Sequence, residues 1–415
     1  MLTLFNAAPD TGNQGVSALC HSAVAGLARR GAANIAVADH GRGQRRARWE
    51  HANVDLVGLT NTRRFWRSDS LKRAYLCARI GAGGSAAARA VARSQAVLDI
   101  SGGDSFTDLY GYQRFQTMVL TKRLALDSGV PLILLPQKLG PFQNSENFET
   151  AKEILRRASA VWVRDFDSFR LLQTALAENF DPDRHRLGVD IAIALPERRP
   201  DELPRLLMRM LSEPRAYPLV GLNVSGLLCN QADMARRNFS LADAHPAQAQ
   251  AVAEALLKTD ASLRLVLIPH VHRPLGDPES DLAAANGLVA RLGPLAEDRV
   301  HVLSDSLSAM ELKWVLARLD WFAGARMHAT IGAFSSGVAT LGLGYSDKVR
   351  GVFQECGFGT EVADLRLLNA RQLAERTVVS FLNRTLMRAN LARRVEGLQA
   401  RASREMDQIA RQVGV

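Results

Sequence analysis

The sequence predicts an α/β protein composed of two Rossmann-like, doubly wound domains. Apolar runs of strand length recur along the chain, and most end in a turn rich in Gly, Asp or Asn. Stretches of helical character separate these runs, which is typical of βαβ units with a parallel sheet. A stretch rich in proline and charge, residues 195–205, interrupts the pattern, which then restarts. The 415 residues suffice for two hydrophobic cores.

The order of elements places the domain boundary at this interruption. We expect an N-terminal domain over 1–198, a C-terminal domain over 206–365 and an arginine-rich helical segment over 366–415. Two such domains with a cleft between them resemble the GT-B architecture, in which a terminal helix packs back on the first domain. We expect strands within residues 2–9, 34–40, 96–106, 130–142, 160–165, 187–195, 217–226, 263–271, 299–305, 320–323 and 338–343, and helices over 16–30, 245–258 and 328–336.

Composition narrows the class of protein. The four cysteines are scattered without a CxxC pair, as is typical of reduced thiols in a cytoplasmic protein. No signal-like leader and no apolar run of about 20 residues occurs. A net charge of +10 favours anionic membrane surfaces or acidic substrates. Nucleic acid is not expected as a partner, since no helix-turn-helix, zinc-finger or RNP-like pattern occurs.

The stretch 320–348 contains the strongest candidate site. Arg326 and His328 lie in the turn between a buried strand and a helix, and Tyr345, Ser346 and Lys348 follow the next strand. Both turns should face one crevice, because parallel sheets bind ligands beyond the carboxyl ends of their strands. Helix N-termini and the two cations there suit a phosphorylated or carboxylated small molecule.

Two turns in the first half also follow predicted strands. Asn13 and Gly15 precede a helix, which suits either close approach of backbone N–H groups to a ligand or an ordinary strand–helix turn. Asp104 lies just past the strand in 96–106, where a carboxylate either accepts a proton from a sugar hydroxyl or caps the next helix. We favour the functional role for Asp104.

Further polar side chains follow three other strands. Gln137 and Lys138 lie between prolines in a stiff loop. Arg164 and the acid after it form either a structural ion pair or an anion clamp. His270 and His272 end the strand in 263–271, with no acidic partner at metal-ligand spacing. Substrate contact is therefore favoured over zinc, and no metal site is expected.

Together these motifs resemble the polysaccharide pyruvyl transferase family. The resemblance extends from about residue 4 to 356 and is most specific between Arg326 and Lys348. The other motifs that carry it are TGNQGVSAL, SGGDSFTDLYG, LPQKLGPF, VWVRDFDS, GVDIAIAL and LIPH.

The resemblance implies a GT-B-like fold and phosphoenolpyruvate as the donor substrate. Pyruvate would be placed as a ketal on a saccharide of a cell-surface polysaccharide or of its lipid-linked precursor. Arg164, His328 and Lys348 match the family's basic donor-site positions. We expect Arg164, Arg326 and Lys348 to hold the phosphate and carboxylate of the donor and His328 to act as the general acid or as a phosphate ligand. Asp104 is expected to act as the base or as a ligand of the acceptor hydroxyl. This chemistry requires no metal or redox cofactor.

Two other functions remain open. A GT-B glycosyltransferase that uses a nucleotide sugar would share the architecture, because fold does not fix function. A catalytically silent homologue that binds saccharide is the second alternative. The joint presence of Arg326, His328 and Lys348 argues against the silent homologue.

A lipid-linked acceptor implies a cytoplasmic protein, peripheral at the inner face of the cell membrane. Residues 62–81 combine six Arg and Lys with Phe65 and Trp66, which suits an interfacial helix or loop. The arginine-rich segment 366–411 is a second candidate for contact with an anionic membrane surface. The alternative for both segments is a solvated basic face.

Overall fold

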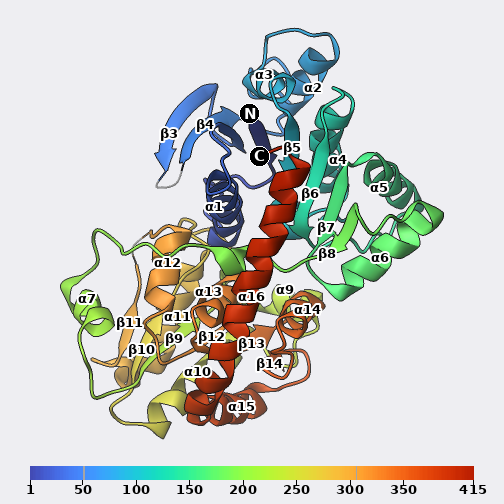
Figure 1. Ribbon diagram of the computed structural model, residues 1–415. Helices are drawn as coiled ribbons and strands as arrows, with labels where there is room; N and C mark the ends of the chain where they lie inside the picture. Colours follow the sequence, from blue (N-terminus) through green and yellow to red (C-terminus); the bar gives the residue numbers. More distant parts are fainter. Residues whose placement is uncertain (50–51, 305) are drawn as a thin grey trace. The chain divides into compact units, whose positions relative to one another are not determined.

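The structure is a computed structural model that describes residues 1–49, 52–304 and 306–415, with the side chains of 347 and 348 outside the described part (Figure 1). The chain divides into two compact units. Unit 1 comprises Met1–Thr11, Leu19–Ala194 and Ala400–Val415, and unit 2 comprises Gly12–Ala18 and Leu195–Gln399. The main division falls at the proline- and charge-rich stretch. The structure differs from the expected domains by assigning the first glycine turn to unit 2 and the final residues to unit 1.

Unit 1 contains an eight-stranded sheet in the order β3-β4-β2-β1-β5-β6-β7-β8. All neighbours pair in parallel except β3 and β4, which form an antiparallel hairpin at one edge. The order reverses on the two sides of β1, so the topological switch point lies between β1 and β5. The strands are β1 (Leu2–Phe5), β2 (Ile35–Asp39), β3 (Gln44–Trp49), β4 (Ala52–Gly58), β5 (Ala96–Asp99), β6 (Leu132–Gln137), β7 (Ala160–Val163) and β8 (His185–Leu187).

The central strands of unit 1 are buried along their whole length, because helices cover the sheet. Ala, Val, Leu and Phe side chains from strands and helices form one apolar cluster there. Residues 400–412 of α16 belong to this unit, where Trp162 Nε1 donates to Gln412 Oε1 at 3.1 Å. The helices are α1 (Gln14–Ala28), α2 (Leu71–Arg79), α3 (Ala86–Ala92), α4 (Tyr112–Leu126), α5 (Ser145–Arg157), α6 (Phe166–Leu176) and α16 (Arg384–Gln412).

The strand expected within 187–195 lies earlier in the chain and shares only Leu187 with the expected range. β8 ends at Leu187, and Ile191–Ala194 form a 3-10 turn. Asp190 bends the chain here: its Oδ1 accepts the backbone N–H two residues on at 2.9 Å, and its Oδ2 binds Arg164 at 2.6 Å. The carboxylate thus ends the strand and fixes a cation from the neighbouring strand.

Unit 2 contains a six-stranded, wholly parallel sheet in the order β11-β10-β9-β12-β13-β14. Its switch point lies between β9 and β12. A second apolar cluster packs under α7 and α12. The strands are β9 (Leu219–Asn223), β10 (Arg264–Leu267), β11 (Val300–Val302), β12 (Trp321–Gly324), β13 (Ala339–Gly344) and β14 (Val362–Asp364), and the helices are α7 (Arg205–Ser212), α8 (Gly226–Cys229), α9 (Ala232–Phe239), α10 (His245–Thr259), α11 (Asp281–Leu292), α12 (Ala309–Leu316), α13 (Met327–Ser335), α14 (Asp347–Glu355) and α15 (Ala370–Leu382).

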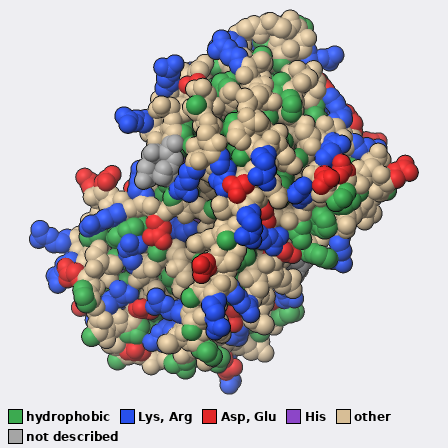
Figure 2. Space-filling view, in the orientation of Figure 1, with side chains coloured by type: hydrophobic (Ala, Val, Ile, Leu, Met, Phe, Trp, Pro, Cys, Tyr) green, Lys and Arg blue, Asp and Glu red, His purple; other side chains and the backbone are tan. Residues whose placement is uncertain are grey.

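The charge of the surface and the hydropathy of the helices agree with what the composition predicts. On the face that Figure 2 presents, Lys and Arg side chains outnumber Asp and Glu. In the described part of the chain, no helix combines the length and the apolar character that crossing a bilayer requires.

Candidate functional site

The carboxyl edge of the unit 2 sheet is organised by Asn223, which ends β9. Its Oδ1 accepts the backbone N–H of Arg326 at 2.9 Å, and its Nδ2 donates to the carbonyl of Ile268 at 2.9 Å. Asn223 therefore bonds to the turns that follow β12 and β10, on both sides of its own strand. The first of these bonds crosses the switch point, where α/β folds bind their ligands.

A buried ion pair fixes the turn after β12. Nη2 and Nε of Arg326 lie 2.8 and 3.1 Å from Oδ1 of Asp281, a fully buried carboxylate. Burial opposes the charge of Arg326, but Asp281 outweighs it and holds the Arg326 pKa above its ordinary value. Oδ2 of Asp281 also accepts the backbone N–H groups of His270 and Val271 at 3.0 Å each. Asp281, which sequence analysis missed, thus connects two turns of the site.

His328 is the second residue of α13 and lies against the glycine turn of residues 12–15. A Cβ added at Gly15 would overlap Nδ1 of His328. Only a glycine at this position allows the imidazole to lie against the start of α1. Asn13 Oδ1 in turn accepts the backbone N–H of Gly15 at 3.0 Å.

The glycine turn is held by the residues that follow β10. Asn13 forms an antiparallel bridge with Val271, the backbone N–H of Gln14 donates to the carbonyl of His270 at 3.0 Å, and that of His272 donates to the carbonyl of Gly12 at 2.7 Å. The structure therefore brings together the predicted residues Asn13, Gly15, His270, Arg326 and His328 in one unit.

Two further histidines of this cluster are biased toward the neutral form. Burial lowers the pKa of His270 well below its usual range, and the neighbouring His328 and His272 act in the same direction. Burial also lowers the pKa of His272. Near neutral pH these imidazoles serve as hydrogen-bonding groups rather than as cations.

The residues after β13 lie in the same unit. Tyr345 packs edge-on against Phe239, with ring centroids 5.0 Å apart, and acts electrostatically on Arg326. Ser346 is the N-cap residue of α14. Lys348 lies in the first turn of that helix, but its side chain falls outside the described part of the structure.

Unit 1 has its own polar cluster at the carboxyl edge of its sheet. Asn6 follows β1 and donates to Oδ2 of Asp99 at 2.6 Å across the switch point. Oδ1 of Asp99 pairs with Nζ of Lys122 at 3.0 Å, and both side chains are fully buried. Burial lowers the pKa of Lys122, although Asp99 opposes this shift. Lys122 also donates to Oγ of Ser101 at 2.7 Å, which anchors the turn that leads to Asp104.

The other predicted residues of unit 1 surround this turn. Nη1 of Arg164 pairs with Asp190, and a Cβ at Gly103 would lie 2.9 Å from it. Gln137 Nε2 donates to the carbonyl of Asp99 at 3.0 Å. The remaining two make contacts of their own: Lys138 Nζ lies 3.6 Å from Asp165 Oδ1, and Asp104 Oδ2 accepts the hydroxyl of Tyr110 at 3.0 Å.

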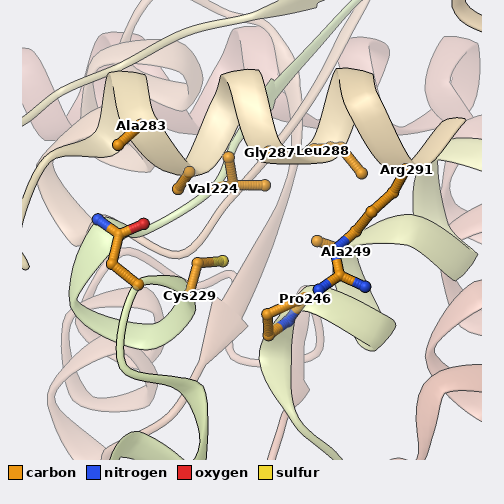
Figure 3. A pocket seen from close by; sticks show the side chains of 10 residues that line it. Val224, Cys229, Pro246, Ala249, Ala283, Gly287, Leu288 and Arg291 are labelled. Atoms are coloured by element: carbon orange, nitrogen blue, oxygen red, sulfur yellow. The ribbon is translucent and has the colours of Figure 1, made fainter. Parts of the chain in front are cut away.

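A pocket of about 100 Å³ lies along α11 in unit 2 (Figure 3). Figure 3 shows the Arg291 side chain extending from α11 toward Pro246 and Ala249 at the start of α10. Cys229 lines the same pocket, and burial raises the pKa of its thiol to about 12. The thiol is therefore protonated and unreactive at neutral pH.

Several solved structures have a fold similar to that of this chain. A putative UDP-N-acetylglucosamine 2-epimerase from Listeria monocytogenes aligns over 94% of this chain and 90% of its own, with a TM-score of 0.59 and 14% identity. HepE of Anabaena, in complex with UDP and glucose, aligns over 99% and 97% (TM-score 0.53, 14% identity). The glycosyltransferase SnogD of Streptomyces nogalater aligns over the full length of both chains (TM-score 0.53, 14% identity). These likenesses show a GT-B-like fold of two Rossmann-like domains.

Sequence comparison gives the family. The amylovoran biosynthesis protein AmsJ of Erwinia amylovora is 21% identical over 267 residues, which are 64% of this chain and 61% of AmsJ. The model of the polysaccharide pyruvyl transferase family matches residues 18–347. With most of its length covered by that match, the chain belongs to the polysaccharide pyruvyl transferase family.

Proposed function

We propose that this protein transfers the enolpyruvyl unit of phosphoenolpyruvate to a saccharide, where it forms a pyruvate ketal. The acceptor would be a cell-surface polysaccharide or its lipid-linked precursor. Membership of the family and the likeness to an exopolysaccharide biosynthesis protein support a transferase acting on polysaccharide. The donor and the ketal are our proposal.

The position of His328 carries this proposal. His328 lies at the start of α13 and against Gly15 at the start of α1, so two helix N-termini meet at one imidazole. Each N-terminus presents backbone N–H groups and a partial positive charge, which favour phosphate and carboxylate. Phosphoenolpyruvate carries both groups, and the imidazole can bind its phosphate or donate a proton.

Arg326 acts chiefly as a positioning residue in this scheme. Its bonds to Asp281 and to the carbonyl of Glu279 use Nε and Nη2. Within the part of the chain that the structure describes, Nη1 makes no such bond and is left for an anion. We propose that Lys348 supplies a further positive charge that binds the donor substrate, and that Tyr345 and Ser346 line the same site.

The reaction balances without a cofactor. A proton added to the methylene carbon of phosphoenolpyruvate makes C2 electrophilic, and one sugar hydroxyl adds to C2 as it loses its proton. A second hydroxyl of the same acceptor then displaces inorganic phosphate from C2 and closes the ketal, and its proton leaves with the phosphate. The chain must supply one acid, one base and groups that hold the anion. We propose His328 as the acid or phosphate ligand.

Unit 1 would supply the acceptor side. We propose Asp104 as the base or as a ligand of the acceptor hydroxyl, with Gln137 and Lys138 near the same turn. Arg164 matches a donor-site position of the family, so we propose that it contributes to binding of the donor. Its Nη1 is engaged by Asp190, so its effect would be partly exerted through the glycine turn that it contacts.

The deciding experiment offers the protein two classes of donor. The purified protein is incubated with phosphoenolpyruvate or with a panel of nucleotide sugars, each with and without saccharide acceptors. Acceptor-dependent phosphate release, together with a ketal in the product spectrum, supports the proposal. Nucleotide release would instead establish a glycosyltransferase. Saccharide binding without turnover of any donor would identify a silent homologue.

A further inference from the structure

Four large apolar side chains of unit 1 are exposed close together in the sequence. Phe65 and Trp66 are 62% and 61% exposed, and Leu76 and Ile80 are 57% and 68% exposed. Single exposed apolar residues are ordinary on protein surfaces, whereas a cluster indicates a surface that another body covers.

The exposed face of α2 presents both apolar and basic side chains. The helix buries Leu71, Ala74 and Cys77 against the unit, at positions i, i+3 and i+6. On the opposite face Lys72, Leu76 and Arg79 follow at i, i+4 and i+7, a spacing that places them in one row. Exposure of these side chains is therefore a consequence of how the helix packs.

The loop before α2 is fixed to this helix. Arg73 Nη1 donates to the backbone carbonyl of Trp66 at 2.5 Å. Phe65 and Trp66 contact each other edge-to-face, with ring centroids 5.7 Å apart. Nε and Nη2 of Arg67 lie 2.9 and 2.5 Å from the two oxygens of Asp69, which is nearly buried. The two aromatic rings are thus presented by an anchored loop.

Charge is concentrated on the same segment. Residues 61–93 contain eight Lys and Arg and one Asp, so their formal charge is 8 − 1 = +7 out of +10 for the chain. Arg67 neutralises that single carboxylate and lowers its pKa, which burial opposes. The nearby Asp127 accepts the hydroxyl of Tyr75 at 2.7 Å and a guanidinium N–H of Arg157 at 2.7 Å. Asp69 and Asp127 are therefore both engaged in ion pairs.

We propose that this surface docks on an anionic lipid bilayer. The aromatic rings of the loop would enter the boundary between headgroups and acyl chains, and the cations would contact lipid phosphates. Nucleic acid also attracts cations and aromatic rings, but the exposed aliphatic side chains of Leu76 and Ile80 in the same segment match acyl chains rather than bases. We name this surface the α2 face; it comprises Arg63, Arg64, Phe65, Trp66, Lys72, Leu76, Arg79 and Ile80.

Vesicle co-sedimentation tests the proposal, independently of the enzymatic activity. Vesicles of phosphatidylcholine with or without phosphatidylglycerol are mixed with wild type, with Phe65→Ser/Trp66→Ser or with Arg63→Glu/Arg64→Glu. We expect wild type to bind only the anionic vesicles and to dissociate at high salt. Each double variant should partition about tenfold less, because it loses either the apolar anchor or the attraction of the cations.

Matched substitutions elsewhere control for charge and hydrophobicity. Leu382→Ser/Leu386→Ser removes two exposed apolar residues of unit 2, and Arg205→Glu/Arg209→Glu reverses two arginines of α7. Both should bind like wild type. The Trp66→Phe variant should bind but lose the blue shift of tryptophan emission on vesicles, and thermal melts of all variants should match.

Three outcomes would overturn the proposal. Wild type that ignores anionic vesicles at low salt excludes the docking surface. An equal loss of binding in the α7 variant would mean that net charge alone drives the attraction. Binding of a single-stranded oligonucleotide with no binding of vesicles would assign the α2 face to nucleic acid.

Discussion

Both units have an asparagine at the carboxyl end of their first strand, but they use it differently. In unit 1, Asn6 donates across the switch point to Asp99, a carboxylate that also binds the buried Lys122. In unit 2, Asn223 accepts the backbone N–H of Arg326 across the switch point, two residues before His328. The first arrangement joins side chains that neutralise one another. The second fixes a backbone from which an imidazole projects.

This difference indicates that the two units have different roles in the proposed reaction. Buried ion pairs cost desolvation energy and add little net stability, so two of them at one sheet edge are best explained as devices that fix the shape of a turn. Unit 1 has such pairs in Lys122–Asp99 and Arg164–Asp190. In unit 2, the pair Arg326–Asp281 lies beside the histidines of the site. The proton chemistry is therefore expected in unit 2, and the precise shape of a polar surface in unit 1.

The largest effect is expected from breaking the central pair of unit 1. Lys122→Met should lower the free energy of unfolding by about 3–5 kcal/mol, because it leaves Asp99 charged and buried. Denaturant titration of the purified variant measures this loss. The double variant Lys122→Met/Asp99→Asn should recover much of it. A loss below about 1 kcal/mol in the single variant would show that water solvates Asp99 and that the turn is not fixed by this pair.

The next effect concerns the imidazole of unit 2. His328→Ala should lower kcat by about tenfold to a thousandfold, the range for an acid or an oxyanion ligand. Donor-dependent phosphate release measures the rate, and a thermal melt verifies folding. His301→Ala, on β11 of the same unit, is the matched control and should remain active. Full activity in a folded His328→Ala variant would remove His328 from the mechanism.

Acid should destabilise unit 2 by about 2 kcal/mol through the protonation of His245 in the unfolded chain. Burial lowers the pKa of His245 in unit 2 to about 4 from an ordinary 6.5. The unfolded chain therefore binds more protons between these values. The stability contribution is full above pH 6.5 and falls as pH drops, by about 2 kcal/mol at pH 5.

Hydrogen exchange at pH 7 and pH 5 measures which unit opens. We expect the protection of α10 to fall first. In unit 1, His40 shifts in the other direction, because its hydrogen bond to Asp10 raises its pKa. His245→Gln should remove the part of the pH dependence of unit 2 that comes from His245, whereas His270 and His272, whose pKa values burial also lowers, should keep theirs. An unchanged dependence in this variant would contradict the assignment to His245.

The smallest effect tests the contact between the two helix starts. Gly15→Ala should reduce kcat by about tenfold, because its Cβ would displace the ring of His328 from its position. The variant Gly397→Ala in α16, where an added Cβ meets nothing, serves as the control. Wild-type kcat in Gly15→Ala would show that the ring can move without cost to the reaction.

Periodicity predicted much of the fold. The strands near residues 34–40 and 160–165 and the helix over 245–258 were predicted close to their observed bounds, because apolar runs and turn residues mark them locally. The β3 edge strand was missed, since its exposed, arginine-rich sequence has no apolar pattern. The strand expected over 187–195 was misplaced, because β8 is His185–Leu187 and the apolar run after it does not reveal that Asp190 turns the chain.

Less of the candidate site than of the fold could be predicted from the sequence. Strand-end turns identified Arg326 and His328, whereas the docking of residues 12–14 on 270–272 depends on segments far apart in the chain. Asp281 is at the first position of a helix, where an acid normally indicates only a favourable helix start. The Arg326–Asp281 pair could therefore be recognised only once the strands had placed the two residues together.

The division of the chain also has a consequence for its synthesis. Residues 400–415 belong to unit 1, where Glu405 accepts the backbone N–H of Val189 and Asp407 pairs with Arg30. On the ribosome, the strands of the unit 1 sheet are all translated long before these partners emerge, and Leu195–Gln399 of unit 2 are translated in between. During this time the surface of unit 1 around Trp162, which residues 400–415 later cover, is exposed. We expect the need for a chaperone to be greatest in this period.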